Sequence, residues 1–540
     1  MGENRPFFSV VIPTLERADT FEHALATVVA QAHSSLEIVV QNNGGDPGTR
    51  RVVEAAGDSR IRLFETSDVL PMTQNWERAL GNARGEWVTF LGDDDGLLPD
   101  ACEVAGTVLE DVGEDELLSW EPFLYLWPDY WNPRRRNVLQ ATVERSFVVQ
   151  RVPSRPMVHR LYGFALHYSK LPMIYNSFVR RSLIERVVGD HGRYFVGALP
   201  DVTSGIVNAA YSEWFLKSTR PLSVAGVSRH STGHRLHRSG SPAAHEDLLD
   251  EFPELASVEI PITESLELCI AADMALVRES IRGQVGELAL DRRAMLQRAA
   301  QAINEAPDRY DAAASAIRRL ADRYGFGPDG VPIPPALPEP PRPPEGTTEL
   351  GPDVALVVLD GAPLGLRTIA DAARAAADLV PDVGALVRAD PRLAADGVPV
   401  VEDGGLRFDR HSGGAFALVS GWSDPEAWGT WSVGEESILR VRVPALRTTS
   451  PVKLALRYRV IPVPDGSPSV VECAVGDAPL ARWELDAASA AGELTLDVPG
   501  GPELVEIRLV APEAKSPLEL GLSDDPRRLG IGVEELRVLA

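Results

Sequence analysis

Apolar segments of strand character alternate with helical segments over the first hundred residues, and this alternation restricts the fold more than any other feature. Apolar runs typical of buried strands occupy residues 8–12, 36–40, 61–64 and 87–91. Apolar spacing of the helical type occupies residues 20–32, 50–56 and 73–83. Strands that are separated by single helices usually pair in parallel, because the helix forms the crossover between them. The alternation therefore predicts an α/β domain with a parallel sheet.

A proline-rich stretch divides the chain. Eight prolines lie between Pro332 and Pro344, and such a stretch favours an extended linker because it can hold neither a helix nor a central strand. The 540 residues also exceed what one hydrophobic core usually organises. We expect an α/β domain at residues 1–250, a helical extension at 251–330, a linker at 331–348 and a second domain at 349–540.

The C-terminal region has the pattern of strands and turns. Apolar and polar residues alternate in its clearest segments, which are residues 438–443, 452–460, 494–500 and 504–510. Several such strands without long helices predict an antiparallel β-sandwich. Trp422, Trp428 and Trp431 would form either a carbohydrate-binding surface of this domain or part of its core.

The composition excludes some classes of protein. A formal net charge of −25 argues against a nucleic-acid partner, because phosphate backbones require a basic surface. Three widely spaced cysteines indicate neither a disulfide framework nor a zinc site. We find no signal-peptide pattern and no apolar run of about 20 residues that would span a bilayer. We therefore expect a cytoplasmic protein without a transmembrane segment, with association at the inner face of the membrane and homo-oligomerisation left open.

Three consecutive acids follow the fourth predicted strand. Asp93, Asp94 and Asp95 stand in the stretch GEWVTFLGDDDGLLPD, and adjacent carboxylates repel one another. Open parallel sheets bind ligands beyond the carboxyl ends of their strands, where Asn42 also falls. Carboxylates are suitable ligands for Mg²⁺ or Mn²⁺, and a bound cation would replace the repulsion by shared coordination. The alternative is a solvated acidic turn.

The motifs SVVIPTLER, LEIVVQNNGG and NWERALGNARGEWVTFLGDDD, in this order, resemble the signature of family 2 glycosyltransferases, which have the GT-A fold. The resemblance covers roughly residues 7–235. It implies transfer of a hexosyl or deoxyhexosyl group, with inversion, from a nucleotide-diphosphate donor to an acceptor hydroxyl. It also implies that Asp93 and Asp95 form the metal-binding DXD motif, with Mn²⁺ or Mg²⁺ as the cofactor.

The same resemblance assigns nucleotide contacts. Pro13, Thr14 and Glu16 lie where the first loop of the family contacts the nucleotide. Asn42 stands where most members have an aspartate that contacts the base. Because an amide both donates and accepts hydrogen bonds, this departure leaves uracil, thymine and guanine open.

Three further residues are assigned to the donor. Asn75 and Arg78 occupy the helix that usually faces the donor, and Arg78 has the chemistry to pair with phosphate. An exposed polar helix face is the alternative for both residues. Asp94, between the two proposed metal ligands, is assigned to the donor as well.

An inverting transferase also needs a general base for the acceptor hydroxyl. The family has it at the start of a helix, and FVGALPDVTSGIVNAAY matches this context with Asp201. Asp201 would alternatively serve only as a helix cap. The segment SRHSTGHRLHR, residues 228–238, contains His230 and His234, which the resemblance suggests as further metal ligands. A solvated basic loop is the alternative reading of that segment.

Aromatic residues suggest an acceptor site. Trp127 and Tyr130 lie in SWEPFLYLWPDYWNPRRR, and Tyr175 lies in LPMIYNSFVRRSLIE, which resembles a segment upstream of the base in related transferases. Aromatic faces stack on sugar rings, although a hairpin packed on the sheet would explain the first segment equally. The resemblance implies a glycan, lipid-linked or protein acceptor and favours bacterial surface polysaccharide or glycoconjugate synthesis.

Two other functions remain open from the sequence. A nucleotidyltransferase also uses acids and a metal on an α/β sheet, but the segment VVIPTLERADT lacks the expected glycine-rich, lysine-containing phosphate loop. A catalytically inactive carbohydrate-binding or scaffold protein is the second alternative. The intact aspartate motif and Asp201 argue against it, whereas Asn42 indicates some divergence.

Overall fold

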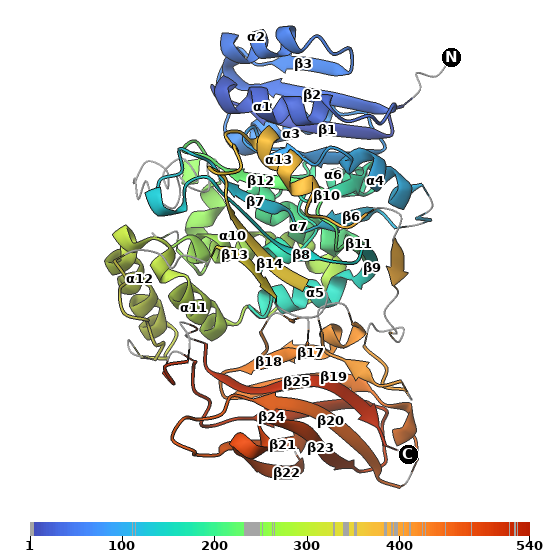
Figure 1. Ribbon diagram of the computed structural model, residues 1–540, viewed down its shortest axis with the longest axis vertical. Helices are drawn as coiled ribbons and strands as arrows, with labels where there is room; N and C mark the ends of the chain where they lie inside the picture. Colours follow the sequence, from blue (N-terminus) through green and yellow to red (C-terminus); the bar gives the residue numbers. More distant parts are fainter. Residues whose placement is uncertain are drawn as a thin grey trace. The chain divides into compact units, whose positions relative to one another are not determined.

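The fold is described from a computed structural model (Figure 1). It describes residues 5–539 apart from 111, 114, 232–248, 251, 262, 264, 328–329, 339–344, 350–353, 383–385, 390–392, 394–397, 403, 410–411, 424, 427, 449, 477, 518, 523–524 and 526. The chain divides into two compact units. Unit 1 comprises Met1–Val158, Tyr168–Glu349 and Asp353–Ala389, and unit 2 comprises His159–His167, Leu350–Pro352 and Asp390–Ala540.

The N-terminal part of unit 1 is the predicted α/β domain. Its parallel strands are β1 (Phe8–Thr14), β2 (Leu36–Asn42), β3 (Ile61–Glu65) and β4 (Trp87–Phe90), in the spatial order β4-β1-β2-β3. The intervening helices are α1 (Ala18–Val29), α2 (Pro47–Ala56) and α3 (Met72–Asn82). The prediction of a parallel sheet is thereby confirmed, and Figure 1 shows these elements together in blue.

Local sequence explains these elements. β1 and β2 are buried along their whole length, which accounts for their continuous apolar runs. Asp46 caps α2 by accepting a hydrogen bond from the N–H of Thr49 at 2.8 Å, and Gly57 ends the helix in the left-handed conformation with φ 59°. β1 continues through Pro13 because its pairing with β4 ends at Val11, so the missing N–H of the proline leaves that ladder intact.

Two sheets extend across unit 1. The first has the order β15-β9-β11-β6-β10-β4-β1-β2-β3 and the second β13-β14-β8-β7-β12-β5. The added strands of the first sheet are β6 (Leu117–Trp120), β9 (Val148–Pro153), β10 (Ser177–Arg180), β11 (Trp214–Ser218) and β15 (Val387–Ala389). The second sheet contains β5 (Gly96–Leu97), β7 (Phe123–Leu126), β8 (Val138–Glu144), β12 (Ser223–Val227), β13 (Gly346–Glu349) and β14 (Val354–Asp360).

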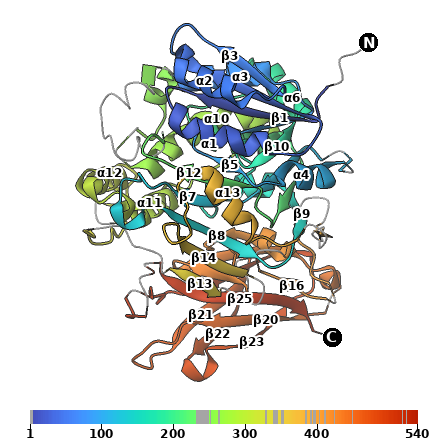
Figure 2. The same cartoon turned by 45° about the horizontal axis from the view of Figure 1, so that its top comes forward.

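Helices complete the unit. They are α4 (Ala101–Leu109), α6 (Arg181–His191), α7 (Pro200–Tyr211), α10 (Leu266–Val285), α11 (Arg292–Gln301), α12 (Tyr310–Arg323) and α13 (Ile369–Ala377). A further helix, α5 (Ser154–Tyr162), belongs to unit 1 up to Val158 and to unit 2 from His159. The predicted helical region corresponds to α10, α11 and α12, and α10 packs against both α7 and α11. Figure 2 shows α13 beside α1, with which it is in contact.

Residues 354–389 lie in unit 1, although the sequence suggested a domain boundary at residue 349. β14 pairs antiparallel with β8 over its whole length, from Val354 opposite Glu144 to Asp360 opposite Val138. The buried face of α13 joins the core of unit 1 through Ile369, Ala372, Ala373 and Ala376. A segment beyond the proline-rich stretch thus returns to the first unit.

Unit 2 contains the predicted antiparallel sheets. One has the order β16-β25-β20-β23, with β18 on β25, and the other has the order β17-β19-β24-β21-β22. Their strands are β16 (Leu406–Arg407), β17 (Leu418–Ser420), β18 (Thr430–Val433), β19 (Glu436–Arg442), β20 (Val452–Val460), β21 (Ser469–Val475), β22 (Ala478–Leu485), β23 (Ala491–Val498), β24 (Leu504–Val510) and β25 (Leu529–Val538). Trp422 belongs to the core of this unit, whereas Trp428 and Trp431 are half-buried.

Candidate functional site

The carboxyl ends of β1, β2 and β4 lie at one edge of the parallel sheet. Thr14 ends β1 opposite Asn42, which ends β2, and the three aspartates follow β4 after Leu91 and Gly92. This edge is where open parallel sheets bind ligands. The carboxylates therefore lie where the strand pattern placed them.

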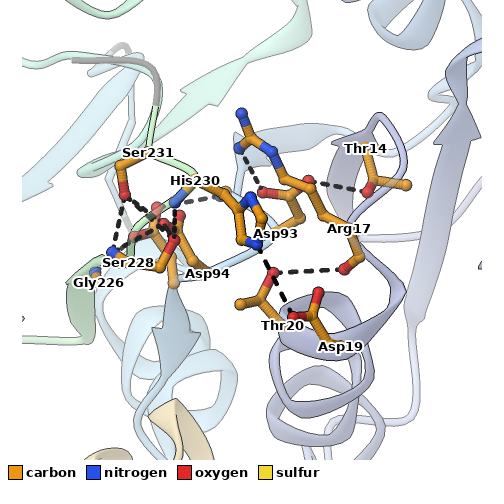
Figure 3. Close-up of polar contacts among 12 residues, drawn as sticks. Thr14, Arg17, Asp19, Thr20, Asp93, Asp94, Gly226, Ser228, His230 and Ser231 are labelled. Atoms are coloured by element: carbon orange, nitrogen blue, oxygen red, sulfur yellow. Dashed lines mark hydrogen bonds and ion pairs between the residues drawn. The ribbon is translucent and has the colours of Figure 1, made fainter. Parts of the chain in front are cut away.

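Asp93 is held by two groups from the β1 end. Its Oδ2 accepts a hydrogen bond from Thr14 Oγ1 at 2.8 Å, and its Oδ1 accepts one from Arg17 Nη1 at 3.0 Å (Figure 3). Burial raises the pKa of Asp93 to about 6, although the Arg17 guanidinium opposes the rise and Asp94 adds to it. One arginine therefore compensates only part of the negative charge.

Asp94 faces another part of the chain. Its Oδ2 accepts hydrogen bonds from the hydroxyl of Ser228 at 2.7 Å, the N–H of Ser228 at 3.3 Å and the hydroxyl of Ser231 (Figure 3). Its carbonyl oxygen accepts a further hydrogen bond from Trp127 Nε1 at 3.1 Å. This aspartate, assigned to the donor from sequence, ties residues 228–231 to the end of β4.

Asp95 is held by backbone groups. Its Oδ1 accepts the N–H of Gly226 at 2.7 Å, and its Oδ2 accepts the N–H of Gly92 at 3.0 Å. Burial, followed by the charge of Asp94, raises the pKa of Asp95 to about 8. At Gly226 a Cβ would lie 1.8 Å from the carbonyl oxygen of Asp94, so this close approach requires glycine.

The imidazole of His230 contacts Asp19 of α1, and its backbone N–H donates to Ser228 Oγ at 3.1 Å (Figure 3). Its Nε2 is 3.9 Å from Asp19 Oδ2 and accepts a hydrogen bond from Arg229 Nε at 2.8 Å. His234 lies outside the described residues. Within the described part of the chain, no group of three or more histidine, cysteine or acidic side chains converges on a metal position.

The remaining donor candidates differ in accessibility. Pro13 is buried in β1, whereas Glu16 is exposed and has φ 52°, the left-handed conformation that few non-glycine residues adopt. Arg78 is exposed on α3. Asn75 is buried on the same helix, and its Oδ1 has no hydrogen-bond partner among the described residues. That oxygen is an acceptor without a partner among the described residues, on a helix that packs against β1 and β2.

Asn42 is engaged within the protein. Its Nδ2 donates to Glu65 Oε1 at 2.8 Å and to the carbonyl oxygen of Asp46 at 3.0 Å. Its Oδ1 accepts the N–H of Asp46 at 3.1 Å, and the residue is 0% exposed. In this arrangement the amide shapes the loop after β2 and presents no free group to a base.

Asp201 is the second residue of α7, after Pro200. Burial raises the pKa of its carboxyl, and a hydrogen bond from the N–H of Val202 opposes the rise. The charges of both Asp201 and the aspartate cluster act on Tyr175. Its phenol has a pKa well above the usual value because of burial first and then the charges of Asp95, Asp201, Asp93 and Asp94. The charges of all four carboxylates therefore disfavour ionisation of Tyr175.

The aromatic candidates are arranged differently from one another. Trp127 is buried against the backbone of Asp94, and Tyr130 belongs to a small core cluster with Leu126 and Val138. Tyr175 is half-buried and packs edge-on against Trp76 at 4.8 Å between ring centroids. Of the two tyrosine candidates, Tyr175 has a pKa that the charges of both Asp201 and the aspartate cluster raise, whereas neither is among the charges that act on Tyr130.

The structure also brings in residues that the sequence did not single out. Arg17 pairs with Asp93, and the hydroxyls of Ser228 and Ser231 donate to Asp94. Asp273 of α10 has a pKa that the charge of Asp201 raises. Arg17 stands in the quoted motif SVVIPTLER, so its position beside Thr14 was a usable signal. The serines and Asp273 are more than seventy residues from their partners, and no local pattern indicates such contacts.

The chain is similar to known proteins over its N-terminal part. Residues 9–181 match the family model described as Glycosyl transferase family 2. A GalNAc(5)-diNAcBac-PP-undecaprenol beta-1,3-glucosyltransferase of Campylobacter jejuni is 35% identical over 99 residues, which are 18% of this chain and 32% of that protein. The succinoglycan biosynthesis protein ExoO of Rhizobium meliloti is 30% identical over 95 residues, 18% of this chain and 27% of that protein.

Solved structures also align with the chain. S. aureus TarS, residues 1–349, is 14% identical, covers 60% of this chain and 88% of its own, and has a TM-score of 0.33. The chain spans about a third of the length of the two curated relatives. No described helix has the length and apolar character needed to cross a membrane.

Proposed function

We propose that this chain, whose residues 9–181 form a family 2 glycosyltransferase domain, transfers a sugar from a nucleotide-diphosphate donor to an acceptor hydroxyl with inversion. The observation that carries the proposal is the position of the three aspartates at the carboxyl edge of the parallel sheet, where Asp93 is bonded to Thr14 and Arg17. Acidic groups at the ligand edge of the sheet lie beside a separate carboxylate, which is what donor binding and proton removal require of one site.

A divalent cation fits the aspartate cluster. Burial and mutual repulsion raise the pKa of Asp93 to about 6 and that of Asp95 to about 8, because Arg17 alone does not balance the charges. Mg²⁺ and similar ions are usually held by one or two protein carboxylates together with substrate phosphates. Asp93 and Asp95 would hold Mn²⁺ or Mg²⁺, and such an ion would neutralise charge on the departing diphosphate.

The chain's own residues would perform the remaining chemistry. The carboxylate of Asp201 takes the proton of the acceptor hydroxyl, and the acceptor oxygen forms a bond to the anomeric carbon of the donor. The bond between that carbon and the diphosphate oxygen breaks, and the nucleoside diphosphate leaves. Tyr175, which stays a neutral phenol because its pKa is raised, is placed to orient one of the two substrates.

Arg17 and Asp94 have separate roles in this proposal. The side chain of Arg17 is 18% exposed beside Asp93, and its guanidinium is placed to meet the diphosphate. Asp94 positions residues 228–231 through Ser228 and Ser231 instead of touching the donor. The engaged amide of Asn42 likewise supports the nucleotide loop from within the protein.

The substrate class follows from the relatives only as a proposal. A beta-1,3-glucosyltransferase and a succinoglycan biosynthesis protein are among the similar proteins, so we propose a hydroxyl of a bacterial glycan or lipid-linked glycan as the acceptor. The donor would be a hexose or deoxyhexose linked to a nucleoside diphosphate. The reaction would take place in the cytoplasm or at the inner face of the membrane.

Incubation with UDP-, dTDP- and GDP-sugars tests the function, with release of nucleoside diphosphate as the readout. We expect release from one nucleotide class with Mn²⁺ or Mg²⁺, and loss of release with EDTA. Formation of inorganic pyrophosphate from a nucleoside triphosphate and a sugar phosphate would instead indicate a nucleotidyltransferase. Metal-independent glycan binding without turnover of any donor would indicate a binding or scaffold protein.

A further inference from the structure

A buried carboxylate of α10 holds the backbone immediately before Asp201. Asp273 is 1% exposed. Its Oδ1 accepts the N–H of Ala198 and its Oδ2 accepts the N–H of Leu199, each at 2.8 Å. Because Asp201 follows Leu199 by two residues, both contacts fix the main chain at the point where α7 begins.

The start of α7 has no side-chain cap of its own. Leu199 occupies the N-cap position without a side-chain hydrogen bond, and Pro200 follows it. The first N–H groups of a helix lack partners within the helix, and a polar N-cap residue usually satisfies them. Asp273, more than seventy positions along the chain, instead binds the amides of Ala198 and Leu199, so α10 holds the main chain that leads into α7.

The segment before α7 fits α10 closely. At Gly197 a Cβ would lie 2.3 Å from Thr203 Cγ2 and 2.8 Å from both Asp273 Oδ1 and Val277 Cγ2. Such distances are shorter than real side-chain contacts, so the backbone there has no room for another residue type. The tight fit leaves the two amides little freedom to move away from Asp273.

A second carboxylate holds the other end of the same segment. Glu77 of α3 accepts hydrogen bonds from the N–H groups of Tyr194 and Phe195. Residues 194–199 are therefore held at one end by Glu77 and at the other end by Asp273. The charge of Asp201 is among the causes that raise the pKa of Asp273. It is not among the causes that act on the pKa of Glu77, which burial raises.

We propose that Asp273 is a positioning residue for Asp201, fixing the start of α7 so that the Asp201 carboxylate faces the acceptor hydroxyl. This inference rests on the proposed function, in which Asp201 is the general base. Burial raises the pKa of Asp273 to about 7, the two amides lower it, and the charge of Asp201 raises it. The charge of Asp201 therefore disfavours ionisation of Asp273.

The other titratable groups around Asp201 affect how kcat depends on pH. Two phenols face Asp201, those of Tyr168 and Tyr175. The charges of Glu267 of α10 and Arg298 of α11 also act on the pKa of Tyr168. The charges of the aspartate cluster also act on the pKa of Tyr175. Both phenols have raised pKa values and stay neutral through the acidic range, so the groups that titrate there are the carboxyls.

The test compares Asp273→Asn with Glu77→Gln in the full chain, measuring kcat as a function of pH at saturating donor. In Asp273→Asn we expect the plateau of kcat to fall about 10- to 100-fold, because the base is displaced. The midpoint of its acidic limb should stay near the wild-type pH, because the charge of Asp201 raises the pKa of Asp273, so Asp273 is already protonated where Asp201 titrates. In Glu77→Gln the plateau of kcat should fall less than in Asp273→Asn, because Glu77 holds amides that lie farther along the chain from Asp201.

A structural readout accompanies the kinetics. Amide hydrogen exchange at Ala198 and Leu199 should accelerate in Asp273→Asn at the same global stability, whereas Glu37→Gln, which alters a buried carboxylate at the other end of the strands, should leave it unchanged. If Asp273→Asn does not fold, Asp273→Glu replaces it and should lower the plateau without moving the midpoint downward. A wild-type plateau in the folded variant would overturn the proposal.

Two failures are distinguishable. Absence of turnover in the wild type with every donor would overturn the proposed function and this role of Asp273. This holds even if hydrogen exchange shows that Asp273 protects the amides of Ala198 and Leu199. Turnover in the wild type with an unchanged plateau of kcat and unchanged exchange in Asp273→Asn would overturn this inference alone.

Discussion

The carboxylate of Asp94 accepts hydrogen bonds from both the hydroxyl and the N–H of Ser228, the hydroxyl lying 2.7 Å away. The two residues are 134 positions apart, and their contact joins the end of β4 to the segment after β12 (Figure 3). The middle aspartate of the cluster is thereby used inside the protein, and Asp93 and Asp95 flank it.

The double variant Ser228→Ala/Ser231→Ala should weaken the reaction by loosening residues 228–231. It removes two hydrogen bonds to a buried carboxylate and leaves Asp94 with the N–H of Ser228. We expect kcat/KM for the donor to fall about tenfold, since hydrogen bonds to charged groups contribute roughly 1.5–3 kcal/mol each. Ser67→Ala, at an exposed serine, is the matched control. Wild-type kcat/KM in the double variant would contradict this role of Asp94.

Gly226→Ala should destabilise the fold. The added Cβ would meet the carbonyl oxygen of Asp94 at 1.8 Å and Trp127 Nε1 at 2.7 Å, so the backbone would have to move. We expect the free energy of unfolding to drop by about 3 kcal/mol or more, measured by urea denaturation. Gly81→Ala, in α3 with open space around it, should leave stability unchanged or raise it. Equal stability of both variants would show that the approach at Gly226 is not tight.

Arg17→Ala should weaken binding of the nucleoside diphosphate. The variant removes the cation beside Asp93, so the cluster becomes more negative and repels the diphosphate. We expect the Kd without added metal to rise about tenfold or more by isothermal titration calorimetry, at roughly 1.4 kcal/mol per factor of ten. Arg374→Ala, on the exposed face of α13, should bind as the wild type does. An unchanged Kd in Arg17→Ala would remove the arginine from the donor site.

Glu121 should make stability depend on pH. Lys217 and Lys170 lower the pKa of its carboxyl against the effect of burial, each with Nζ 2.7 Å from a carboxylate oxygen. A carboxyl with a lowered pKa in the folded state stabilises above its unfolded pKa of 4.5, and that contribution is lost as the pH falls through the folded pKa. Glu121→Gln should therefore lower Tm at pH 7, and the difference from the wild type should shrink below about pH 4.5. A difference that does not depend on pH would contradict the ion-pair account.

Periodic patterns account for what the sequence predicted well. The strands and helices of the first ninety residues follow from apolar runs and helical spacing, and a parallel sheet brings the ends of its strands to one edge. The aspartate cluster and Asn42 could be assigned to that edge without any contact being known. The antiparallel strands of unit 2 followed from their alternating pattern in the same way.

Contacts between distant segments account for what the sequence missed. The run VALVVLD at residues 354–360 is recognisable as a strand, but nothing local indicates that it pairs with β8 across the proline-rich stretch. Asp273 lies on an apolar helix, and its partners are the amides of Ala198 and Leu199, which leave no trace in side-chain patterns. Trp127 has the composition of a sugar platform, yet its ring packs on the backbone of Asp94.

The central claim, that Asp201 is the base facing a donor held at the aspartate cluster, is tested most directly by Asp201→Asn. The variant keeps the shape of the side chain but removes the carboxylate, with Asp190→Asn on α6 as the control. We predict that Asp201→Asn binds the donor with a Kd within about threefold of the wild type and loses at least 10²-fold in kcat. Turnover at the wild-type rate in the folded variant would contradict the account.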